Sequence, residues 1–407
     1  MRLTLTTRQE LTKEVRDRYW RASKKQKTLI LDQFVASTGY HRKYAVAVLR
    51  QKPRRDRTPD VSTAGTAGVR RRRRIYTQDV TDALVLIWKT CAYIGSKRLH
   101  PFLPEMVRVL ESYGELRVPD QTKQLLLTIS RATIDRLLKP ARRGQTRHGR
   151  STTKPGTLLK KSIPIRTWND WDDARPGFLE IDLVAHTVES TEGDYLATLN
   201  CVDVSTAWSE CMIPRNRSEH AVCEALEAIR QRLPMPLLGI DSDNGAEFIN
   251  NHLKRYCDRE HITFTRSRPY KKNDQAHVEG KNWTVVRRFM GYERYEGDVA
   301  RIEINALYQD IRLHVNFFQP VMKLVSKTRI DGKVKKVYDT AKTPYQRVLA
   351  SADVTQDTKD ALTALYNTLN PVALYDRIQK QLDHIWEVHR IPDHMVRTRR
   401  EATNASK

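Results

Sequence analysis

Three acidic residues in the second half of the chain could act together as metal ligands. Asp182 and Asp243 lie on apolar stretches typical of β-strands, and Glu279 falls one to two turns into a predicted helix. Carboxylates gathered in one place repel one another unless a cation joins them, and Mg²⁺ or Mn²⁺ suits such oxygen ligands. Two ions in one site can activate an attacking oxygen and stabilise a leaving one during a displacement at phosphorus. The three acids therefore indicate a site that holds two divalent ions and acts on phosphate esters.

Two neighbouring acids compete for these roles. Asp241 shares a strand face with Asp243, but 37 residues separate it from Glu279 and Asn-Gly does not follow it directly. We therefore expect Asp243 to be the metal ligand and Asp241 to support the end of the strand. Glu180 shares a face with Asp182 one pleat deeper, which favours an ion pair or a contact with a ligand residue over direct metal binding.

The pattern from residue 178 onward predicts a mixed sheet with helices packed on it. Residues 178–187 alternate between apolar and other side chains, which puts Glu180 and Asp182 on one face of a strand. The predicted order of elements is β-β-β-α-β-α-β-α. The strands are expected at 178–187, 195–204, 207–213, 237–243 and 262–267, and the helices at 218–233, from about 246 to 259, and from near 273.

The composition indicates a cytoplasmic protein that binds a polyanion. The 407 residues carry a formal net charge of +24, and residues 1–177 contain 39 Lys and Arg against 16 Asp and Glu. A basic block of that size is typical of nucleic-acid binding, and the alternative is a merely basic surface. No apolar run approaches the roughly 18 residues of a membrane span. The N-terminus is charged too early for a secretory signal, and the five cysteines form no C-x-x-C pair.

Two segments of the basic region read as helix, turn, helix. In the first, Ser37-Thr38-Gly39 separates an apolar helical stripe from a second helix that opens with His41, Arg42 and Lys43, where a recognition helix would meet a major groove. In the second, Ser130 is the expected N-cap, Arg131 opens the helix and Pro140 ends it. A plain pair of helices is the alternative in both cases. The first stripe consists of Leu29, Ile30, Phe34 and Val35.

An unbroken arginine run follows the small-residue stretch VSTAGTAG. Such a run is either an arm that lies along phosphates or in a minor groove, or a solvated linker. We expect an arm, because both neighbouring segments are predicted to bind DNA. The run consists of Arg70, Arg71, Arg72, Arg73 and Arg74.

The helix that carries Glu279 is also predicted to face DNA. Gln275 and Asn282 lie four residues before and three residues after Glu279, so they share its helical face. Amide and ammonium donors there would contact a DNA strand end, and the alternative is an ordinary charged surface helix. The predicted contacts are Lys271, Lys272, Asn273, Gln275, Lys281 and Asn282.

The three acids stand in a specific sequence context. Asp182 is on the first strand, Asp243 directly precedes Asn-Gly-Ala-Glu-Phe, and 35 residues separate Asp243 from Glu279. In the positions and spacing of these acids, residues from about 170 to 320 resemble the catalytic core of the DDE transposase/integrase superfamily, of the retroviral-integrase type. The resemblance implies a ribonuclease-H-like fold whose three acids bind two Mg²⁺ ions. The helical region before the core resembles bacterial insertion-sequence transposases, and the His-His-Cys-Cys zinc spacing of retroviral integrases is absent.

The chain is therefore predicted to be multidomain, with an α-helical DNA-binding region, an α/β ribonuclease-H-like core, a small β subdomain and a helical tail. The subdomain is expected to contain a basic hairpin that turns at Asp331-Gly332 and touches DNA. The apolar stripe of the tail either packs on its own core or contacts a second subunit. The predicted boundaries are 1–60 and 75–141 for the two helical DNA-binding domains, 142–169 for a basic linker, 170–318 for the core, 319–350 for the β subdomain and 351–407 for the tail.

These patterns and the resemblance together predict a DNA transposase. It would bind the ends of a mobile element, cut DNA with metal-activated water and join the 3′-hydroxyl ends to target DNA. Its partners would be double-stranded DNA and at least one further copy of the chain on DNA, with no membrane. The alternatives are a ribonuclease-H-like nuclease that only hydrolyses, and a DNA-binding regulator without catalysis.

Overall fold

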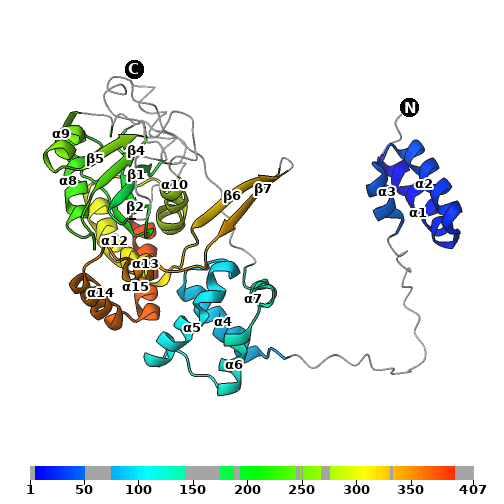
Figure 1. The fold of residues 1–407 in the computed structure, drawn as a ribbon, viewed down its shortest axis with the longest axis horizontal. Helices are drawn as coiled ribbons and strands as arrows, with labels where there is room; N and C mark the ends of the chain where they lie inside the picture. Colours follow the sequence, from blue (N-terminus) through cyan, green and yellow to red (C-terminus); the bar gives the residue numbers. More distant parts are fainter. Residues whose placement is uncertain are drawn as a thin grey trace. The chain divides into compact units, whose positions relative to one another are not determined.

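The computed structural model describes residues 5–50, 75–142, 175–187, 193–243, 248, 251–266, 276–330 and 333–389. The chain divides into two compact units, residues 1–73 and residues 74–407 (Figure 1). Several predictions fall outside the described residues, among them the hairpin turn at Asp331-Gly332. The predicted DNA contacts that lie outside are Arg70, Arg71, Arg72, Arg73, Arg74, Lys271, Lys272, Asn273 and Gln275.

Three helices form the described part of the first unit: α1 (Leu5–Arg21), α2 (Lys24–Thr38) and α3 (Arg42–Leu49). α2 ends because Gly39 takes a left-handed conformation, with φ of 68°, that glycine adopts without steric cost. His41 is the N-cap of α3, and its Nδ1 accepts a hydrogen bond from the Lys43 backbone N–H at 3.3 Å. The local signals of the sequence therefore predicted where these helices break.

The core of the first unit differs from the predicted apolar stripe at one position. Leu29 is 64% exposed, and Leu31 is buried in its place. The physical reason is that α2 packs against both α1 and α3, so its buried face is centred on the side that lies between these two helices. The buried residues are Tyr19, Ile30, Leu31, Phe34, Ala45 and Leu49.

A mixed sheet is the centre of the second unit. Its order within the described residues is β3-β2-β1-β4-β5, with β1 antiparallel to β2 and parallel to β4. β2 and β3 are antiparallel, and β4 and β5 are parallel. The strands are β1 (Phe178–Ala185), β2 (Ala197–Asp203), β3 (Ser209–Met212), β4 (Gly239–Ser242) and β5 (Thr263–Arg266). The predicted strands are all present, although each of them is shorter than expected.

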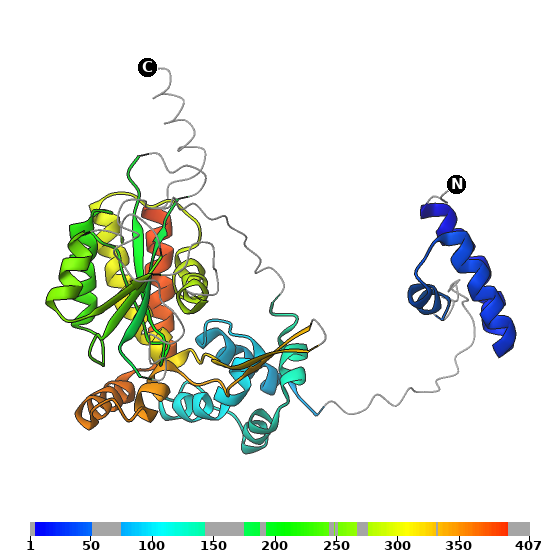
Figure 2. The same cartoon turned by 45° about the horizontal axis from the view of Figure 1, so that its top comes forward.

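Helices cover both faces of this sheet (Figures 1 and 2). The alternation predicted for the first strand is confirmed, because Leu179, Ile181 and Leu183 share one apolar core with helices α8 (Glu219–Arg230) and α9 (Asn251–Arg259). Glu180 and Asp182 consequently belong to the opposite face, where α10 (Ala276–Lys281) contacts β1 and β2. The sheet thereby separates a purely apolar layer from the layer that contains the acids.

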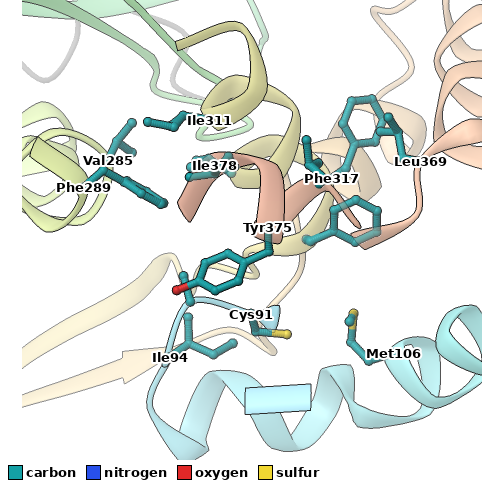
Figure 3. Packing of buried hydrophobic residues seen from close by; sticks show 14 of the residues in the cluster. Cys91, Ile94, Met106, Val285, Phe289, Ile311, Phe317, Leu369, Tyr375 and Ile378 are labelled. Atoms are coloured by element: carbon teal, nitrogen blue, oxygen red, sulfur yellow. The ribbon is translucent and has the colours of Figure 1, made fainter. Parts of the chain in front are cut away.

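The helices α4 (Gln78–Thr90), α5 (Ser96–Ser112), α6 (Asp120–Thr128) and α7 (Arg131–Leu138) share one hydrophobic core with the C-terminal half of the chain. Figure 3 shows Cys91, Ile94 and Met106 packed near Tyr375 and Ile378. His314 Nε2 on α12 (Asp298–Phe318) contacts the Thr90 carbonyl oxygen at 2.6 Å. These helices and the sheet therefore fold as one unit, while DNA binding by α6 and α7 stays a prediction.

The predicted helical tail is present as α14 (Gln356–Thr368) and α15 (Pro371–Val388), which follow the short helix α13 (Pro344–Ala350). α15 packs on α12, and its apolar stripe is buried in the shared core. The α15 part of the stripe therefore packs in the chain's own core, which was the alternative, whereas Leu365 on α14 is 36% exposed. The buried residues of α15 include Leu374, Ile378, Leu382 and Ile385.

A separate two-stranded ribbon connects α12 to α13. β6 (Leu324–Ile330) and β7 (Lys333–Tyr338) pair in antiparallel fashion, which confirms the predicted hairpin. In Figure 1 the ribbon extends away from the sheet, and in Figure 2 it overlaps the helices α4–α7. Among the described helices, none has the length and apolar content needed to cross a membrane.

Candidate active site

The register of two parallel strands brings the two aspartates of the predicted site together. Ile181 on β1 pairs with Ser242 on β4, so the next residue on each strand is Asp182 and Asp243. Gly239 allows this approach, because a Cβ atom at that position would overlap the Phe178 ring. Both aspartates are half-buried, and they lie where β4 ends. The carboxyl ends of such strands are where α/β proteins commonly bind ligands.

A chain of hydrogen bonds orients the Asp182 carboxylate. Asn282 Nδ2 donates to Asp182 Oδ2 at 2.5 Å, and Asn200 Nδ2 donates to Asn282 Oδ1 at 2.8 Å. Asn200 is the cross-strand partner of Asp182 on β2, and its Oδ1 lies 3.4 Å from the Cys211 sulfur. Since each amide is held at both ends, the carboxylate has little freedom to rotate.

Asn282 therefore contacts β1 and β2 while it is half-buried, and its contact with DNA stays a prediction. The prediction that Lys281 faces DNA is wrong, because this residue is only 7% exposed. Burial, together with repulsion from Arg98, lowers the pKa of the Lys281 ammonium group to about 7. Local spacing put both residues near Glu279 but could not tell that Lys281 is buried and that Asn282 contacts the sheet.

Glu180 fixes the helix that carries the third acid. Its buried carboxylate accepts hydrogen bonds from the backbone N–H groups of His277 and Val278, each at 3.0 Å. These donors belong to the first turn of α10, where the helix leaves N–H groups without intrahelical partners. A carboxylate also interacts favourably with the helix dipole at this end. Glu180 thus ties β1 to the start of α10.

Glu279 is exposed on α10, about one turn before Asn282. The helix continues without a break into a π-helix, η1 (Asn282–Arg287), and then α11 (Arg288–Met290). Wider π-helical turns are rare and frequently occur at functional sites. Because Asn282 contacts Asp182 directly, Glu279 stands near the two aspartates on the same side of the sheet.

The donor chemistry of the site suits Mg²⁺ or Mn²⁺, since Asp182, Asp243 and Glu279 offer only hard carboxylate oxygens. Within the described ranges, no three His, Cys, Asp or Glu side chains lie close enough together to hold a metal ion. The strand register therefore supplies two of the acids, and the structure does not bring Glu279 into a closed group with them.

Two further polar residues, one on β4 and one directly after β1, are engaged inside the protein. Asp241 is buried, and its Oδ1 accepts a hydrogen bond from Thr265 Oγ1 of the next strand at 2.7 Å. His186 Nε2 lies 2.7 Å from Thr198 Oγ1, and burial lowers the pKa of this imidazole to about 3. The neutral, enclosed ring is therefore a structural group.

Sequence reasoning missed Asn200 and Arg287. Asn200 is a polar residue in an otherwise apolar strand, YLATLNCVDV, and that interruption was a usable signal. Arg287 Nη2 donates to the Ala185 carbonyl oxygen at 2.7 Å and fastens η1 to the end of β1. No local pattern could predict this contact, because Arg287 and Ala185 are far apart in sequence.

The predicted DNA contacts that the structure describes outside this site are mostly exposed. Arg42 forms an exposed ion pair with Asp32, and Lys43 is exposed on the same helix. Arg131 is exposed at the first position of α7, where Ser130 Oγ accepts from the Thr133 backbone N–H at 3.2 Å. The predicted Ser130 N-cap is thus confirmed.

Comparison with known proteins identifies the segment around the two aspartates. Residues 172–272 match the family described as Integrase core domain, a segment that contains Asp182 and Asp243 and ends before Glu279. The Uncharacterized protein y4rM of Sinorhizobium fredii (strain NBRC 101917 / NGR234) is 40% identical over 350 residues, which cover 85% of this chain and 96% of that protein.

Two solved structures are also similar to this chain. The catalytic core domain of BIV integrase has a TM-score of 0.28 at 17% identity, covering 42% of this chain and 91% of that one. The HTLV-2 integrase catalytic core domain in complex with magnesium (dimeric form) has a TM-score of 0.27 at 14% identity, covering 42% of this chain and 95% of that one.

The observed strand order and the matched segment agree on a ribonuclease-H-like integrase core. Because residues 172–272 match the Integrase core domain and include the strands that bring Asp182 and Asp243 together, the chain belongs to the DDE transposase/integrase superfamily.

Proposed function

We propose that this protein is a DNA transposase that binds the ends of a mobile element, cuts DNA strands there and joins the 3′-hydroxyl ends to target DNA. The observation that carries the proposal is the β1–β4 register, which sets Asp182 beside Asp243 in an integrase core. Both steps are displacements at phosphorus, so one site can perform them in turn. Water attacks in the first step, and the freed 3′-hydroxyl attacks in the second.

In this proposal Asp182, Asp243 and Glu279 hold two Mg²⁺ or Mn²⁺ ions. When bound, such ions lower the pKa of the attacking oxygen and stabilise the leaving oxygen. Asn282 holds the Asp182 carboxylate in one orientation, and Glu180 keeps α10 against β1. Closure of Glu279 toward the aspartates would complete the site when DNA is present.

A strand-joining assay tests the function. The substrate is a duplex from the inverted repeats that flank the coding region, incubated with a supercoiled plasmid and Mg²⁺. We expect end duplex covalently joined to plasmid. Cutting without joining would identify a nuclease instead, and end binding without cutting would identify a regulator.

Asn282→Ala is expected to lower the cleavage rate by about 10- to 100-fold, the usual effect of removing a group that orients a metal ligand. The Mg²⁺ concentration needed for half-maximal rate should rise, because Asp182 loses its 2.5 Å hydrogen bond. The affinity for end DNA, measured without metal, should stay unchanged. Asn367→Ala, an exposed asparagine on α14, is the matched control. An unchanged Mg²⁺ dependence in Asn282→Ala would argue against the positioning role.

The first unit is proposed to recognise the element ends through α3. A fragment of residues 1–73 should bind end DNA with an affinity that falls steeply with salt, because released counterions set the salt dependence. A longer fragment of residues 1–150, which would include both predicted helical DNA-binding domains, is a poor test. It would separate α4–α7 from the core that they share with the C-terminal helices. Full end-specific binding by residues 74–407 alone would refute this division of roles.

Such a transposase has to act on two ends, so we propose that at least two copies assemble on DNA. The stripe of α15 is not the contact. Mass measurement of the complex with end DNA gives the number of chains.

A further inference from the structure

No described part of the chain covers either face of the ribbon of β6 and β7. Every ribbon side chain whose exposure is described is exposed, which includes both members of each opposed pair from Leu324–Tyr338 to Thr328–Lys335. A two-stranded ribbon alone in water is marginally stable. The ribbon nevertheless exposes large apolar side chains, with Val325 at 66% and Val334 at 50%. These features are typical of a surface that is covered by something else during function.

The charge of the ribbon shows what kind of partner fits it. Lys327 and Lys336 are opposed across the strands, and Lys335 is on the neighbouring pair. Like charges placed directly opposite destabilise a ribbon. In the described part of the chain, none of these three ammonium groups forms an ion pair with a carboxylate. The segment 324–338 contains five Lys or Arg and one Asp. A polyanion would relieve this repulsion.

The root of the ribbon, in contrast, is firmly held. Asp339 Oδ1 accepts from the Lys323 backbone N–H at 2.7 Å, and Asp339 Oδ2 pairs with Arg347 at 2.8 Å. Lys323 Nζ donates to the Ser205 carbonyl oxygen, in the turn between β2 and β3, at 2.7 Å. The exposed ribbon is therefore attached to the five-stranded sheet in a defined orientation, as an element that positions DNA requires.

From these observations we propose that the β6–β7 ribbon is an arm that lies in the major groove of the DNA that flanks the reacting strand. The proposal rests on the proposed function in that the substrate is double-stranded DNA. A major groove admits a two-stranded ribbon, and strands of this length span about 20 Å, roughly six base pairs. Lys327 and Lys336 share one face of the ribbon with Val334. On that face the two lysines reach phosphates, and Val334 faces base edges such as thymine methyl groups.

The test measures how DNA binding depends on salt, without metal, and compares the full-length wild-type protein with full-length variants. Lys327→Ala/Lys336→Ala should remove two phosphate contacts, and each contact adds about 0.9 to the slope of log affinity against log salt. Between 50 and 200 mM salt the wild-type protein should then lose about 12-fold more affinity than the double variant. The melting temperature should stay the same or rise, because the opposed lysines repel one another. Lys359→Ala/Lys380→Ala removes the same charge from α14 and α15 and should keep the wild-type slope.

The outcomes separate this inference from the proposed function. A double variant with the wild-type salt slope would overturn the arm, even if the wild-type protein cuts and joins DNA. Absence of DNA binding by the wild-type protein would refute the function itself. The other occupant to consider is a second copy of the chain. Val334→Ser/Val337→Ser would then reduce the mass of the DNA complex while the lysine variant bound normally, and that result would also overturn the arm.

Discussion

Asp182→Asn, Asp243→Asn and Glu279→Gln should each reduce strand cleavage by about a thousandfold or more, while the affinity for end DNA changes little. Removing a single group that stabilises charge in a transition state already costs on the order of 10²- to 10³-fold. Loss of a metal ligand acts on both the attacking and the leaving oxygen. Affinity is preserved because the positive charge of the chain, rather than its acids, attracts the phosphates.

The measurement is cleavage of an end duplex with Mg²⁺, alongside a gel shift without it. Asp258→Asn, an exposed acid on α9, is the control for loss of one negative charge. Asp241→Asn should also keep most activity, because an amide oxygen can still accept the hydrogen bond from Thr265. If Asp243→Asn cleaved normally while Asp241→Asn did not, the two aspartates would have been assigned in the wrong order.

Truncation after Asp353 should unfold the second unit rather than merely prevent assembly on DNA. It removes α14 and α15, whose apolar side chains complete the core shared with α4, α5 and α12. The single substitution Ile378→Ala should already lower the free energy of unfolding by about 2–5 kcal/mol, since this side chain is fully buried. Thermal unfolding followed by circular dichroism measures both effects.

Val388→Ala on the same helix is the control, because Val388 is 57% exposed and its truncation should change stability by no more than about 0.5 kcal/mol. A truncated protein that stayed folded and monomeric yet failed to assemble on DNA would contradict this view. It would restore α14 and α15 as the contact between subunits.

The local sequence determined the elements and much of their polarity. Alternation along residues 178–187 predicted a strand with Asp182 on the face opposite the apolar core, and β1 has that polarity. Ser130 and Ser218 cap the helices that follow them, and Gly39 ends α2. These features could be predicted because capping, left-handed conformations and periodic burial depend on neighbours within a few residues. The spacing around Asp243 and Glu279 pointed to the family for the same reason, as a local motif.

Only the tertiary structure decided which distant residues meet. Asp182 and Asp243 become neighbours through the parallel pairing of β1 with β4, which no local pattern specifies. Asn282 contacts β1 and β2 because Asp182 and Asn200, one on each strand, form hydrogen bonds with its side-chain amide. Its spacing from Glu279 had indicated only a residue that faces DNA. The stripe of α15 was visible in the sequence, but its partner was not. The physical reason is that hydrophobic period shows which side of a helix must be buried, while only packing shows what buries it, and here α12 does so.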